Sequence, residues 1–64
     1  MNRAIDAHIL VRIGHISGER FVFIYTDATR QDLLRYIGRL ASDEDVGFTW
    51  YDCAVCAQKL RGET

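Results

Sequence analysis

One short stretch limits what this chain can fold into: Phe21 to Thr26, a run of β-branched and aromatic residues. Length and propensity both predict a β-strand here. A strand with water on one side alternates apolar and polar residues, whereas this strand is apolar or nearly so on both sides. We therefore expect both of its faces to be covered. The two faces are Phe21, Phe23 and Tyr25 on one side and Val22, Ile24 and Thr26 on the other.

The chain has only 64 residues with which to provide that cover. This length predicts a single domain, residues 1–64, that buries roughly 60% of the surface of its unfolded chain. Apolar residues make up 48% of the sequence, as is typical of globular domains. Domains this small are commonly stabilised by disulfides, a metal or oligomerisation. Two cysteines are too few for a disulfide framework, so oligomerisation is the expected means of stabilisation.

The formal net charge is −1, which argues against a dedicated nucleic-acid binder, because such proteins depend on neutralising phosphates. The sequence contains no long apolar run, no signal-peptide pattern and no lipidation motif. We therefore expect a soluble cytoplasmic protein with no membrane partner.

A second strand is predicted before the first, because apolar residues occupy every second position from Ile5 to Ile13. The alternation predicts that this row is buried and that the intervening row, with His8 and Arg12, is exposed. Gly14 and Gly18 suit the turn of an antiparallel hairpin that spans roughly residues 5–26.

A helix is predicted over residues 29–42, with its apolar residues in one arc. Thr29 and Asp32 have the spacing of a capping box, and Asp27 is the competing cap. Gly38 costs a helix about 1 kcal/mol relative to alanine. We expect a close helix contact at this glycine to offset that cost. The arc consists of Leu33, Leu34, Ile37, Leu40 and Ala41.

A second helix is predicted over residues 49–61, with a capping box at Thr49 and Asp52 and a C-terminal cap at Gly62. Its expected packing arc is Trp50, Cys53, Ala54, Cys56, Ala57 and Leu60. The fold class is therefore α+β, a β-hairpin followed by two amphipathic helices (ββαα). The aromatic residues of 46–51 favour a third strand instead, which gives the alternative order ββαβα.

Cys53 and Cys56 have the Cys-x-x-Cys spacing of thiol and metal sites. Zinc needs two further ligands, and the only histidines, His8 and His15, do not form a compact pair. Both cysteines are better explained as small buried residues of the second helix. We expect no metal and no cofactor, and a thiol or metal-binding protein is the alternative function.

Arg35 and Arg39 lie in one helical row that would suit an anion, although such a row is usually a solvated helix face. No nucleophile occurs at a recognised motif spacing and no phosphate-binding loop is present, so catalysis is not predicted. A weak nucleic-acid-binding module is the third functional class. The strand at 21–26 does not favour it, because Glu19 and Ile24 stand where RNA-binding strands carry aromatic residues.

Apolar surface beyond the needs of one small core is the strongest functional signal, since such surface usually marks a contact site. It predicts a non-catalytic interaction or assembly module that binds another protein or, preferentially, itself as a homodimer. The candidate interface residues are Phe21, Phe23, Tyr25, Tyr51 and Val55. Pairing of hairpin edges and back-to-back stacking of sheets are both open to such a dimer.

Overall fold

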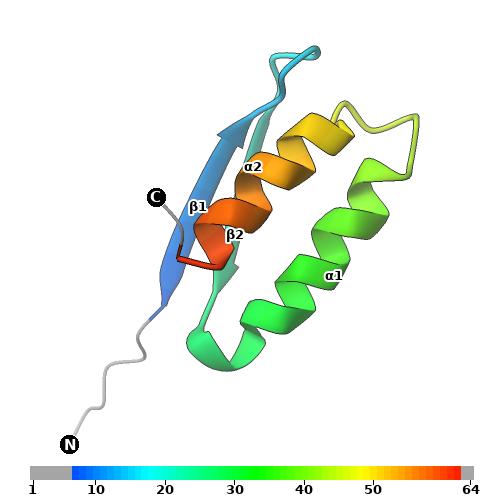
Figure 1. The fold of residues 1–64 in the computed structure, drawn as a ribbon. Coiled ribbons are helices and arrows are strands. Elements are labelled where there is room, and N and C mark those ends of the chain that lie inside the picture. Colours follow the sequence, from blue (N-terminus) through cyan, green and yellow to red (C-terminus); the bar gives the residue numbers. More distant parts are fainter. Residues whose placement is uncertain (1–6, 63–64) are drawn as a thin grey trace, which may run out of the picture.

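Two strands pair as a hairpin, and two helices pack on one face of it (Figure 1). The computed structural model describes residues 7–62. The predicted ββαα order is confirmed, and the third strand proposed for 46–51 is wrong, because α2 begins there at Trp50. The elements are β1 (His8–Ile13), β2 (Arg20–Tyr25), the short 3-10 helix η1 (Asp27–Thr29), α1 (Arg30–Ala41) and α2 (Trp50–Leu60).

The hairpin turn is closed by hydrogen bonds between backbone groups of its two glycines and Glu19. The Gly14 N–H donates to the Glu19 carbonyl (2.7 Å), and the Gly18 N–H donates to the Gly14 carbonyl (3.0 Å). Gly18 has φ of 74°, a left-handed conformation that glycine adopts without strain. The resulting register places His8 opposite Tyr25 and Ile13 opposite Arg20.

The loop between the helices fills the end of the core with an aromatic ring. Phe48 is almost completely buried and packs edge-on against Phe21 and Phe23, with ring centroids 5.1 and 5.9 Å away. The aromatic residue that suggested a third strand therefore has a different role. The buried apolar residues are Leu10, Phe23, Leu33, Ile37, Ala41, Phe48, Cys56 and Leu60.

Gly47 in the same loop lies against the hairpin turn. The Ser17 hydroxyl donates to the Gly47 carbonyl (3.0 Å). A Cβ atom at Gly47 would lie only 2.4 Å from the Ser17 Cβ, so this approach requires glycine.

The N-terminal cap of the first helical segment is Thr26, three residues earlier than predicted. Thr26 and Thr29 form a capping box around η1, and the helix continues directly into α1. Thr29 makes no side-chain cap to α1, so the predicted Thr29–Asp32 box is wrong. Asp27 does not cap the helix; it lies inside η1 and binds Arg30 (2.6 Å).

The buried side of α2 is rotated from the predicted arc. Asp52, Cys56 and Leu60 are buried, whereas Trp50 and Ala54 are exposed. The Thr49–Asp52 capping box is confirmed, and Gly62 has the positive φ (79°) of a C-terminal cap. The contact expected at Gly38 is wrong, because nothing lies within 4 Å of a Cβ atom built there.

Candidate interaction surface

β1 is turned opposite to the prediction. Ile9, Val11 and Ile13 are exposed, and Leu10 is buried opposite Phe23. The register explains the orientation, because residues directly opposite each other point to the same face of a sheet. Once the large aromatic row of β2 faces the helices, its β1 partners must face them too.

This orientation brings Arg12 beneath α2, where it meets the fully buried carboxylate of Asp52. Arg12 Nε and Nη2 each lie 2.8 Å from Asp52 Oδ1. The His15 backbone N–H donates to the same oxygen (2.9 Å), and the Thr49 N–H donates to Oδ2 (2.9 Å). A buried charge is tolerated only when paired and hydrogen-bonded, and Asp52 meets both conditions.

The surroundings keep Asp52 ionised. Burial alone raises the pKa of this carboxyl, but the hydrogen bonds from the Thr49 backbone, the Arg12 guanidinium and the His15 backbone outweigh burial. The net effect is a pKa below the ordinary value. The site is therefore a structural anchor with every polar atom occupied.

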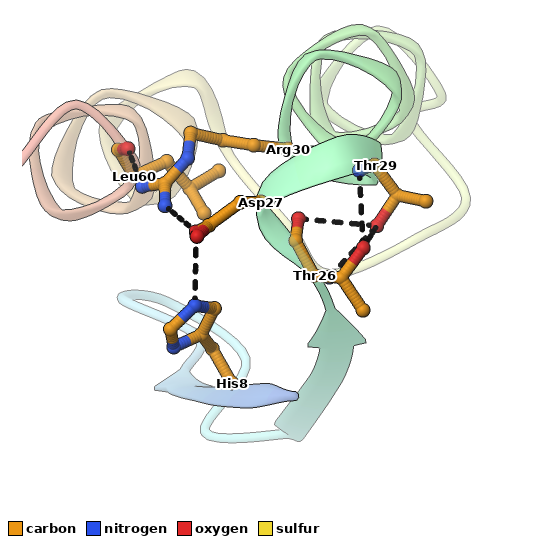
Figure 2. Close-up of polar contacts among 6 residues, drawn as sticks. All are labelled: His8, Thr26, Asp27, Thr29, Arg30 and Leu60. Carbon is orange, nitrogen blue, oxygen red and sulfur yellow. Dashed lines mark hydrogen bonds and ion pairs between the residues drawn. The ribbon is translucent and has the colours of Figure 1, made fainter. Parts of the chain in front are cut away.

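His8, another polar residue of this row, contacts side chains of its own chain at the exposed opposite end of the sheet (Figure 2). His8 Nε2 lies 3.1 Å from Asp27 Oδ1, and the Arg30 guanidinium donates to the same oxygen at 2.6 Å. Arg30 also donates to the Leu60 carbonyl (2.5 Å), where a cation suits the C-terminus of α2. The hydrogen bonds from Arg30, which has the larger effect, and from His8 lower the pKa of Asp27. These contacts join β1, η1, α1 and α2.

The face of the hairpin opposite the helices carries almost only aliphatic side chains. Ile9 lies opposite Ile24, and Val11 lies opposite Val22. The charged side chain on this side is Arg20, which stands at one end opposite Ile13. We call this surface the aliphatic face; it consists of Ile9, Val11, Ile13, Val22 and Ile24, each between 49% and 71% exposed.

The predicted interface residues divide between the core and the other side of the molecule. Phe23 is buried, and Phe21 and Tyr25 are half-buried against the core. The aromatic row of β2 is therefore the side that the helices cover. Tyr51 is exposed beside His15 (ring centroids 4.6 Å apart), and Val55 is half-buried. The exposed apolar row of β2 is Val22 and Ile24 instead.

The two cysteines are free thiols on the packed side of α2. Cys56 is in the core and Cys53 is half-buried. Burial raises the pKa of both, which disfavours the reactive thiolate. Within residues 7–62, no three His, Cys, Asp or Glu side chains are grouped so as to hold a metal ion.

The predicted anion row is partly occupied by the protein's own carboxylate. Arg35 pairs with Asp32 at 2.6 Å, and both side chains are 69% exposed. Arg39 lies on the exposed side in the last turn of α1, where it suits the helix dipole. In the part of the chain that the structure describes, residues 7–62, no further group that would select an anion is seen at this row.

Sequence reasoning missed the Arg12–Asp52 pair and the aliphatic face. The sequence did contain a signal for both. A hairpin register counted back from the turn places Leu10 opposite Phe23, which turns Arg12 toward the helices and Ile9 away from them.

Comparison with protein-family models, with curated proteins and with solved structures finds no match to this chain. Over residues 7–62, neither helix has the length and apolar character needed to cross a bilayer.

Proposed function

We propose that this protein is a small non-catalytic assembly module that binds a second copy of itself through the aliphatic face. The observation that carries the proposal is the grouping of five exposed aliphatic side chains on one side of a two-stranded sheet. Exposed apolar patches of a few hundred Å² on small proteins often mark contact sites. A cytoplasmic location is part of the proposal and is compatible with the free thiols of Cys53 and Cys56.

The charge distribution of the aliphatic face favours a second copy as the occupant. The face is uncharged along its length, and Arg20 stands at one end only. A twofold axis perpendicular to the strands brings that end against the Ile9 and Ile24 end of the other copy. The two Arg20 side chains then lie far apart, so the face is complementary to itself.

The small core supports the same conclusion. Among residues 7–62, eight apolar residues are buried, whereas the five side chains of the aliphatic face are each about half exposed or more. A chain of this size gains stability when association covers such a surface, because binding to the folded state alone shifts the folding equilibrium.

The test is the solution mass by sedimentation equilibrium across a wide concentration range. We expect masses above the monomer's 7.3 kDa and a clear loss of association in Ile9→Lys. Ile16→Lys is the matched control: Ile16 is 77% exposed, against 68% for Ile9, but lies in the hairpin turn outside the aliphatic face. A monomer at every concentration, or equal effects of the two substitutions, would contradict the proposal and leave another protein as the occupant.

A further inference from the structure

The aliphatic face of one copy is small for a stable contact. The face holds five exposed aliphatic side chains and presents roughly a few hundred Å² of apolar surface. A standard interface buries about 800 Å² on each partner. Two hairpins side by side in one sheet double the apolar surface and so bring it closer to that size. Such pairing takes place at an outer edge of the sheet.

The turn shows which backbone groups point to those edges. The Gly14 N–H donates across the hairpin to Glu19. In an antiparallel ladder, the N–H and C=O of a residue point to the same side, and successive residues point to opposite sides. The backbone groups of Val22 and Ile24 therefore point away from β1, and those of Val11 and Ile13 point away from β2. Within residues 7–62, β1 and β2 pair only with each other.

The two edges differ in the side chains that a paired copy would meet on the helix side. Self-pairing of β1 about Leu10 would place His8 opposite Arg12 of the other copy, two basic residues whose acidic partners lie within their own chain. Self-pairing of β2 about Phe23 would place Phe21 opposite Tyr25 of the other copy. Aromatic cross-strand pairs stabilise a sheet, whereas His8 and Arg12 are already bonded to carboxylates of their own chain and gain no partner in each other. The side chains thus favour β2.

A groove beside β2 provides room for a partner strand's side chains. It lies between the edge of β2 and α1, where Leu33, Tyr36 and Leu40 line the helix side. Phe21 and Phe23 line the sheet side. An added strand would direct alternate side chains into this groove and the others into the aliphatic face.

We infer that two copies of the chain join edge to edge through β2, in a register centred on Phe23. Val22 then exchanges backbone hydrogen bonds with Ile24 of the other copy, and the sheet has four strands in the order β1-β2-β2-β1. The arrangement is isologous and therefore closed, unlike β1-to-β2 pairing, which continues into a filament. It rests on the proposed function, because it doubles the aliphatic face through which two such pairs stack.

Residue-resolved amide hydrogen exchange of the full chain tests this inference, with dilute and concentrated samples compared. We expect the Val22 and Ile24 amides to exchange at least about tenfold more slowly in the concentrated sample. The amides of Val11 and Ile13 serve as an internal control: they belong to the same aliphatic face, so stacking affects both pairs of amides alike and only edge pairing slows Val22 and Ile24 further. An assembled protein in which the Val22 and Ile24 amides exchange as fast as this control pair would overturn edge pairing while leaving face stacking intact. A monomer at every concentration would overturn both proposals.

A matched pair of substitutions supplies a second readout. Tyr36 lines the groove and is 51% exposed, whereas Tyr51 is 56% exposed on α2, away from that edge. Tyr36→Lys is expected to abolish the protection of Val22 and Ile24 and to halve the assembled mass. Tyr51→Lys is expected to leave both unchanged. If Tyr36→Lys assembles with full protection of the two amides, β2 is not the joining edge.

Discussion

The guanidinium of Arg12 and the carboxylate of Asp52 form an ion pair inside the molecule, with two nitrogens of Arg12 each 2.8 Å from one Asp52 oxygen. Asp52 is 0% exposed, and Arg12 retains 20% exposure of its side chain. This pair is the reason that a charged residue is tolerated on the buried side of β1. The two residues are 40 positions apart in the chain.

Replacement of Asp52 is predicted to destabilise the fold strongly. Asp52→Asn removes the charge that Arg12 needs and weakens the cap of α2, so we expect a loss of about 2–4 kcal/mol, reduced somewhat because Arg12 reaches solvent. Urea unfolding measures the change. Asp32→Asn is the matched control, since Asp32 is also in a first helical turn and pairs with an arginine, but in solvent. Its expected loss is below about 0.5 kcal/mol, and equal losses would disprove the role given to Asp52.

Stability is predicted to fall in acid chiefly through the same carboxylate. The folded-state pKa of Asp52 is below its ordinary value of 3.8. In acid the unfolded chain therefore takes up a proton at this group before the folded protein does, and the free energy of unfolding decreases as pH falls. The stabilisation is complete above about pH 5 and is lost progressively below about pH 4. Unfolding curves from pH 3 to 6 should show a shallower pH dependence in Asp52→Asn, and an unchanged slope would refute this assignment.

The pattern of residues predicted the elements well and their orientation poorly. The Thr49–Asp52 spacing correctly marks the start of α2, and period-2 alternation correctly marks β1. Alternation separates two faces of a strand but does not say which one is covered. On β2 the aromatic row faces the helices because each aromatic ring buries more surface than Val22 or Ile24. Pairing then turns Leu10 inward and Ile9 outward.

The sequence did not show which side of β2 carries its exposed apolar residues. The candidate interface residues included Phe23, which is in the core, whereas Val22 and Ile24 are exposed. The deciding interaction joins Arg12 to a carboxylate on the last helix. Periodicity within a short segment carries no information about a partner 40 residues away.

Gly38→Ala is predicted to stabilise the protein. Gly38 lies inside α1 with open space where a Cβ atom would be, so the substitution gains helix propensity of about 0.5–1 kcal/mol without a clash. Gly18→Ala is the contrasting control, because φ of 74° there strains any L side chain. Thermal unfolding should show opposite shifts in melting temperature for the two variants. A lower melting temperature for Gly38→Ala would indicate a contact at this helix position.

The two cysteines are predicted to differ in reactivity and in their contribution to stability. Cys56→Ala removes a core side chain and should cost about 1–2 kcal/mol, whereas Cys53→Ala at a half-buried position should cost less than about 1 kcal/mol. Labelling with a thiol reagent should modify Cys53 first, and Cys56 only as the protein unfolds. Zinc should leave the melting temperature unchanged. A rise of many degrees with zinc, or faster labelling of Cys56, would contradict this assignment.

The contacts of Asp52 also bear on how the chain holds together as a unit. The groups that donate hydrogen bonds to Asp52 come from β1, from the hairpin turn and from the cap of α2. Asp52 therefore connects the first third of the chain to the last third. A cut in the 42–49 loop would leave Arg12 on one fragment and Asp52 on the other, each without its counter-charge. Neither fragment would then retain the fold alone, and mixing the two should restore it, because the interior charge of each is satisfied only by the other.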